Sequence, residues 1–187
     1  MNKIFYSLLL FLLILPVSLQ AQTIALKSNL FYDATTTLNV GAEFGLSPRW
    51  SLDLTVGYNP RTFSDNRKLK QFFVQPEARY WLCERFNGHF FGVHLLGGAF
   101  NFGGISFPGL SERFRYEGWA GGVGLAYGYQ WMIGRRWNLE ASLGLGYLYA
   151  RYDKYECAAC GKNLEANRTH SFFTPTKASI SIIYLIK

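Results

Sequence analysis

Long apolar runs are missing from most of this chain. Of its 187 residues, only those near the start contain one, IFYSLLLFLLILPV, and nothing beyond it approaches the ~20 residues that a membrane-spanning helix needs. A helical span in the rest of the chain is therefore excluded. Charged residues are also few, at 17%, whereas aromatic residues reach 18% and the mean hydropathy is +0.02. This balance is expected when polar and apolar residues interleave along the chain.

Cysteine is scarce, and its spacing limits the metal sites that the chain could form. Cys157 and Cys160 form a Cys-x-x-Cys-Gly turn, which is half of a four-ligand zinc site, but the chain has no second pair. In an oxidising compartment the pair predicts a small disulfide loop; the alternative is a metal shared with His170 or with a partner chain. Cys83 is expected at the opposite end of the fold, as a lone buried or interfacial thiol. We predict no metal site of this chain alone and no cofactor.

The apolar run near the start has the features of a secretory leader. Asn2 and Lys3 precede it, and SLQAQ follows it, so residues 1–21 resemble a Sec signal peptide with cleavage after Ala21. Residues 22–187 then form one domain of an exported protein. An exported chain without a helical span can cross a membrane only as a closed barrel of strands.

The main pattern of the mature chain is a strict alternation of apolar and polar residues. In WSLDLTVGYN, residues 50–59, Trp50, Leu52 and Leu54 share one face and Asp53 lies on the other. The same alternation occurs in residues 38–46, 71–82, 119–132, 137–149 and 178–186, and more weakly in 23–32 and 89–100. Proline is rare and glycine is abundant, which also favours strands over helices. We therefore predict an all-β fold: an eight-stranded antiparallel up-and-down transmembrane β-barrel.

Connection lengths and aromatic positions favour a membrane barrel over a soluble sandwich or soluble barrel. The connections SPR, CERFNG and IGRR are short, whereas PRTFSDNRKLK, GGISFPGLSERFRYE and KYECAACGKNLEANRTH are long, which is typical of periplasmic turns and extracellular loops. Trp or Tyr residues flank the apolar face of several expected strands, as in the two aromatic girdles of such barrels. In a soluble protein, the same apolar faces would instead form a core.

Charged residues on the other face are expected inside the barrel. They are Lys27, Glu43, Asp53, Glu77, Arg79, His94, Glu140 and Lys177. Eight strands leave an interior just wide enough for side chains, so these charges are expected to neutralise one another as a salt-bridge plug. A proton relay or a binding site is the less favoured interpretation. Pro76 lies inside an expected strand and predicts a bulge or a kink there.

Several segments resemble a known family. LKSNLFYDATTTLNVGAEFGLSPRWSLDLTVGYNP, VQPEARYWLCERFNGHFFGVHLLGG, RYEGWAGGVGLAYGYQW and TKASISIIYLIK are similar to a family of small bacterial outer-membrane β-barrel proteins that is known only as a domain of unknown function. The resemblance covers nearly the whole mature chain. It implies the outer membrane of a Gram-negative bacterium and, for relatives encoded beside fimbrial genes, an accessory role in surface-fibre assembly. The chain departs from known eight-stranded barrels in ending Ile186-Lys187 rather than in an aromatic residue.

Two other functions remain as alternatives to a structural or interaction role. A lipid A-modifying rim enzyme would need a nucleophile, a base and an acid, for which Ser171, His170 and Asp153 are the candidates. A narrow pore is the second alternative.

The distribution of basic residues predicts the partners. The net charge is +7, but the basic residues lie at both expected membrane borders and form no single stripe, so nucleic acid is not expected. The expected partners are outer-membrane lipid, including lipid A phosphates, and a surface-fibre or envelope protein.

Overall fold

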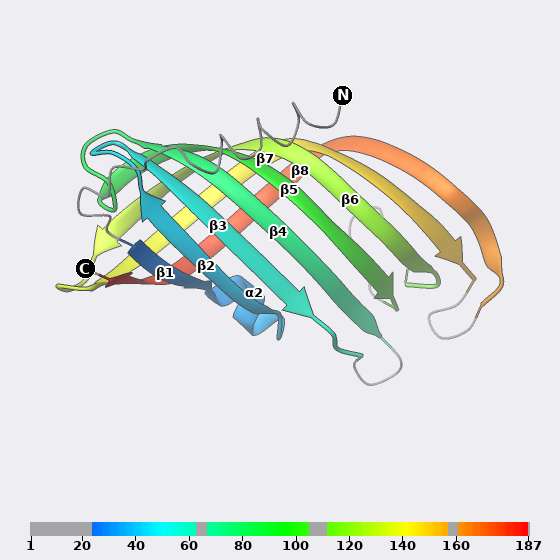
Figure 1. Cartoon of the computed structure of the whole chain (residues 1–187). Coiled ribbons are helices and arrows are strands. Elements are labelled where there is room, and N and C mark those ends of the chain that lie inside the picture. Colours follow the sequence, from blue (N-terminus) through cyan, green and yellow to red (C-terminus); the bar gives the residue numbers. More distant parts are fainter. Residues whose placement is uncertain (1–23, 63–66, 105–111, 157–160, 187) are drawn as a thin grey trace, which may run out of the picture.

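The computed structural model describes residues 24–62, 67–104, 112–156 and 161–186. Eight antiparallel strands follow one another in chain order and close into a hydrogen-bonded ring, in which the last strand pairs with the first (Figure 1). The strands are β1 (Ile24–Asn29), β2 (Leu38–Gly45), β3 (Trp50–Asn59), β4 (Lys68–Trp81), β5 (Gly88–Gly103), β6 (Arg115–Met132), β7 (Trp137–Tyr155) and β8 (Asn163–Ile186). The predicted all-β class and strand number are confirmed. No helix in the described residues is long and apolar enough to span a membrane.

A short helix, α2 (Leu30–Ala34), interrupts the first expected strand. The Asn29 side chain accepts a hydrogen bond of 3.1 Å from the Phe31 N–H and so caps the helix. The prediction of a strand over residues 23–32 was therefore wrong beyond Asn29. The helix lies in the connection between β1 and β2.

The strands lengthen steadily around the ring, from 6 residues in β1 to 24 in β8. The long loops expected at residues 103–117 and 154–170 are correspondingly shorter, because β6 begins at Arg115, β7 continues to Tyr155 and β8 begins at Asn163. The sequence prediction was wrong in these segments. Their residues are polar on both faces, so the backbone ladder continues where the hydrophobic alternation no longer reveals it.

Pro76 does not produce a bulge. The register between β4 and β5 is the same on both sides of it, although Gln75 and Pro76 have no partner in β5. The described bulge nearest to the middle of a strand lies in β8, where Gly144 pairs with Lys177 and Leu145 pairs with Pro175, so Thr176 is the extra residue. Thr176 and Lys177 are both buried, and the alternation of faces reverses between them.

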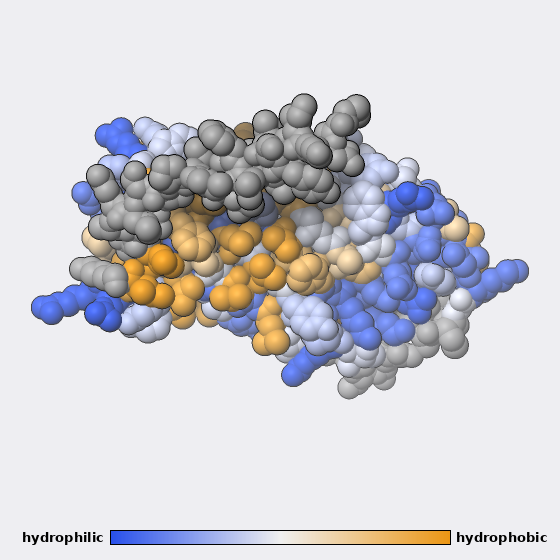
Figure 2. Space-filling model, in the orientation of Figure 1, coloured by the Kyte–Doolittle hydropathy of each residue, from blue (hydrophilic) through white to orange (hydrophobic). Residues whose placement is uncertain are grey.

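The ring is polar inside and apolar outside. Trp50, Leu52 and Leu54 are exposed on the outer face, whereas Asp53 is 1% exposed. Figure 2 shows the apolar residues gathered in a band across the strands, with hydrophilic residues on either side of it. Most buried side chains are polar or charged, which is the reverse of an ordinary soluble core.

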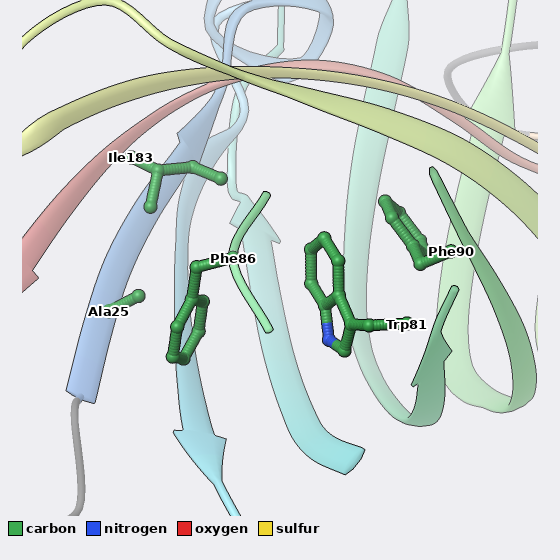
Figure 3. Packing of buried hydrophobic residues seen from close by; sticks show 5 residues of the cluster. All are labelled: Ala25, Trp81, Phe86, Phe90 and Ile183. Atoms are coloured by element: carbon green, nitrogen blue, oxygen red, sulfur yellow. The ribbon is translucent and has the colours of Figure 1, made fainter. Parts of the chain in front are cut away.

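A small apolar cluster fills the interior at the end where the short turns lie. Ala25, Trp81, Phe86, Phe90 and Ile183 come together there (Figure 3). The Trp81 ring lies 4.9 Å from that of Phe90 and 6.0 Å from that of Phe86. The Trp81 indole N–H donates a hydrogen bond of 2.8 Å to Ser51 Oγ, so its polar atom is also satisfied. This cluster closes the turn end of the interior.

Trp81→Ala is expected to lower the free energy of unfolding by about 3–5 kcal/mol, because it leaves a cavity and removes the hydrogen bond from the indole N–H to Ser51 Oγ. Urea unfolding followed by circular dichroism measures the change. Leu164→Ala, at an exposed site in β8, is the control and should change stability by less than about 0.5 kcal/mol. Equal effects of the two substitutions would contradict the assigned cluster.

Candidate functional site

A network of charged side chains fills the interior next to the apolar cluster, with Arg79 at its centre. Arg79 Nη1 lies 2.8 Å from Glu43 Oε2 and 2.7 Å from Glu140 Oε2. Arg79 Nη2 lies 2.9 Å from Asp53 Oδ2, and Nε lies 2.6 Å from Glu77 Oε1. The Arg79 side chain is 0% exposed. One guanidinium therefore contacts four carboxylates, using the planar fork of donors that only arginine has.

Two lysines complete the pairing of these carboxylates. Lys27 Nζ lies 2.6 Å from Glu43 Oε2 and 3.3 Å from Asp53 Oδ2. Lys177 Nζ lies 2.6 Å from Glu77 Oε2. Four carboxylates thus face three basic side chains, none of which is more than 8% exposed. Each charge has at least one oppositely charged neighbour, as buried charges require.

His94 lies at the edge of the network. Its Nε2 makes a hydrogen bond of 2.8 Å with Thr176 Oγ1, and its Nδ1 lies 3.7 Å from Glu77 Oε2. An added Cβ at Gly124 would come within 2.6 Å of His94 Nε2. The bulge at Thr176 and the missing side chain at Gly124 together make room for the imidazole.

Strand register explains why the acidic residues meet. Glu43 pairs with Asp53, and Asp53 pairs with Glu77, across three neighbouring strands. Like charges directly opposite one another are destabilising in a sheet, so this row depends on the cations placed over it. Glycine provides the space for them: a Cβ at Gly41 would lie 2.5 Å from Lys27 Cγ.

A cavity of about 10 Å³ adjoins the network and is lined by Lys27, Asp53, Arg79 and Glu140, among others. This is room for about one water molecule. Asp53 Oδ1 is buried and has no hydrogen-bond partner among the described residues. A single water in this cavity is well suited to pair with that oxygen.

The eight charged residues that the sequence placed inside all lie in the interior. Seven of them form the ion-pair network, and His94 lies at its edge and makes its hydrogen bond with Thr176. The central position of Arg79 was missed, because alternation assigns a face but does not identify the partners on that face. The three residues of the enzyme alternative are not brought together. His170 pairs with Ala150 and Ser171 with Tyr149, so their side chains leave opposite faces of β8. Asp153 Oδ1 accepts a hydrogen bond from the Asn167 N–H at 2.7 Å.

The other sequence predictions concern the three cysteines, the signal peptide and a metal site. Cys157, Cys160 and residues 1–21 lie outside the described residues. Cys83 is exposed, in the turn after β4, so the expectation of a buried thiol was wrong, and the interfacial alternative stays a prediction. Among the described residues, no group of three or more His, Cys, Asp or Glu is arranged to hold a metal ion.

An arrangement of arginine, tryptophan and tyrosine occurs twice at the turn end and was not predicted from the sequence. Arg49-Trp50 and Arg136-Trp137 each begin a strand, four strands apart. Arg49 Nη1 donates to the Tyr80 hydroxyl at 3.4 Å, and the Trp50 and Tyr80 rings lie 5.1 Å apart. The equivalent bond from Arg136 to Tyr184 is 3.1 Å, with the Trp137 and Tyr184 rings 5.0 Å apart. The hydrogen bond to tyrosine raises the pKa of each guanidinium. The repeated letters RWSLD and RWNLE were the available signal.

Comparison with known proteins gives one match. Residues 7–186 match the family described as "Protein of unknown function (DUF3575)". The chain belongs to this family. The match spans nearly the whole chain, as the resemblance implied. Among curated proteins and among solved structures, the comparison finds no match. Membership of DUF3575 therefore assigns no activity to the chain.

Arg79→Met is expected to lower the free energy of unfolding by about 3–5 kcal/mol or to prevent folding, because it leaves four buried carboxylates with two lysines. Urea unfolding measures the loss. Arg49→Met removes an exposed arginine at the turn end and serves as the control, with an expected change within the error of the measurement. A tolerated Arg79→Met would mean that the network contributes little to stability.

Proposed function

We propose that this DUF3575 protein is an outer-membrane β-barrel with a structural or interaction role, whose loop end meets surface partners. The observation that carries the proposal is the inverted polarity of the ring, with buried charges inside and large apolar side chains exposed outside. Leu125 is 68% exposed and Leu143 is 59% exposed, in the middle of β6 and β7. Monomeric soluble proteins rarely expose continuous apolar surface of this extent, whereas lipid requires it.

Aromatic residues support the same assignment. Trp119 and Trp131 flank Leu125 on the outer face of β6, and both are about half exposed. Trp119 contacts Tyr149 of β7, with ring centroids 5.7 Å apart. The rows of Trp and Tyr on both sides of an apolar band resemble the interfacial girdles of membrane barrels.

The even number of strands places the described ends of the chain at the turn end (Figure 1). In the proposed orientation this end is periplasmic and the loop end faces outward. Arg151 and Lys70 are exposed near the loop end of their strands, where they are suited to contact lipid A phosphates. A role in surface-fibre assembly rests on the family resemblance, and the loop end is where such a partner would bind.

The two alternatives receive less support from the geometry. A rim enzyme requires Ser171 and His170 to meet, but they leave opposite faces of β8. A pore requires an open path, but side chains fill the interior around Arg79. Ser171→Ala separates the first alternative from a structural role, because it would abolish a lipid-modifying activity. Stepwise conductance in planar bilayers would support the second.

The first experiment is a heat-modifiability gel on the outer-membrane fraction extracted with detergent. The proposal predicts that the unboiled protein migrates faster than the boiled protein and retains β-type circular dichroism. A protein recovered in soluble form, without a difference in migration, would contradict the membrane assignment.

Leu125→Arg provides a second test, because the cost of arginine should depend on depth in the membrane only if the outer face contacts lipid. In a membrane barrel, an arginine at the midplane of the outer face should reduce the stability of the folded protein in vesicles by about 2–4 kcal/mol. Leu38→Arg is the matched control, because Leu38 is 71% exposed but pairs with Tyr58 at the border of the band. Its expected cost is only about 0–1 kcal/mol. Equal costs at the two sites would contradict the proposal.

A further inference from the structure

Strand β8 has β7 on one side and β1 on the other, and it extends far beyond the end of β1. It pairs with β7 over almost its full length, but β1 reaches only Ser181, which pairs with Asn29. Figure 1 shows β8 running well past the ends of β1 and β2. The part of β8 from residue 168 to residue 173, named here the free edge, has no strand beside it on the β1 side among the described residues.

Helix α2 does not cover the free edge. It follows Asn29 and contacts β8, but its five residues span only about 7.5 Å. Phe173 is eight residues from Ser181, which corresponds to about 26 Å along a strand. The free edge is therefore out of reach of α2.

The hydrogen bonds of Asn29 show which backbone groups face the β1 side. The Asn29 side chain donates to the Ala178 carbonyl at 3.2 Å and accepts from the Ile180 N–H at 3.3 Å. On the C-terminal side of the bulge, even-numbered residues of β8 therefore present their backbone groups to the β1 side. The extra residue Thr176 reverses the alternation, so on the N-terminal side of the bulge the odd-numbered residues present their backbone groups to the β1 side. Pro175 agrees with this, because a residue without an N–H is tolerated where the group would point away from β7.

Thr169, Ser171 and Phe173 thus present N–H and C=O groups along the free edge at strand spacing. Residues 168–173 are all exposed, and Phe173 is 71% exposed. Phe173 pairs with Tyr147, whose side chain lies on the outer face, so this end of the edge borders the apolar band, where water cannot satisfy an amide. Asn167, with φ 57°, and Pro175 bound the segment. An unpaired edge of this kind is a template for an added strand.

We infer that the free edge of β8 binds an extended segment of a separate protein at the outer surface by strand addition. This inference rests on the proposed function, which places the loop end outside the cell. A second copy of the chain is a poorer occupant. Antiparallel pairing of two identical edges needs a two-fold axis perpendicular to the sheet, which would invert one copy in the membrane.

Charge indicates the chemistry of the partner segment. Among the described residues toward the loop end, basic residues outnumber acidic ones: Arg61, Arg67, Lys68, Lys70, Arg113, Arg115, Arg151, Lys154, Lys162 and Arg168 against Asp33, Glu112, Glu117, Asp153, Glu156 and Glu165. A neutral or acidic segment is therefore favoured. Its backbone supplies the pairing, and its alternate side chains lie beside Thr169 and Ser171 on one face and His170 and Phe172 on the other.

The test uses the full chain in the intact outer membrane, with the photocrosslinking residue p-benzoylphenylalanine in place of Thr169. The second change is Ser171→Pro, which removes the central edge donor but no donor of the ladder to β7. The matched control is Ser171→Ala, which keeps the N–H. We expect a crosslink to one extended segment, located by mass spectrometry, with a yield about tenfold lower in Ser171→Pro and within about twofold of the parent in Ser171→Ala.

Three results would overturn the inference: no crosslink, a crosslink to a second copy of the chain, or a crosslink that Ser171→Pro leaves unchanged. The heat-modifiability gel is run on every variant. A normal band shift with no crosslink would reject strand addition and leave the proposed barrel intact, whereas loss of the shift in the parent chain would reject the barrel itself.

Discussion

The contact of one guanidinium, Arg79, with four carboxylates is the constraint on which the rest of this structure depends. Glu43, Asp53 and Glu77 lie side by side across three strands, an arrangement that is unfavourable without a cation over it. Because side chains alternate strictly, slipping one strand by a single residue would move its acidic residue to the apolar outer face. The pairing of charges inside and the position of apolar residues outside therefore select the same register.

The narrow interior makes this arrangement possible and limits what it can do. Glycine at positions such as Gly41 leaves room for a long charged side chain of the neighbouring strand, here Lys27. At the turn end, Trp81 and its aromatic neighbours close the remaining space. The interior is thus suited to hold the ring rigid. Recognition of a partner is then left to the loop end and the strand edges.

The unequal strand lengths are where this ring differs from a symmetric cylinder. The 6 residues of β1 lie beside the 24 residues of β8, so the ring closes at the turn end but not along the upper part of β8. A bulge at Thr176 and a proline at position 175 lie between the closed part, which ends at Ser181, and the free edge of residues 168–173. The bulge that accommodates His94 inside also sets which backbone groups of β8 point toward the free edge.

The sequence by itself determined the period of two and therefore the faces: Trp50 outside and Asp53 inside follow from spacing along a single strand. It also determined which residues carry the interior charge. It did not reveal helix α2 or the ends of β6, β7 and β8, because a polar cap and segments that are polar on both faces carry no hydrophobic period. Only the tertiary structure decided that Arg79 is the centre of the network and that Thr176, rather than Pro76, carries the bulge. Both depend on which residues of other strands lie next to a given residue, and alternation along one strand contains no information about its neighbours.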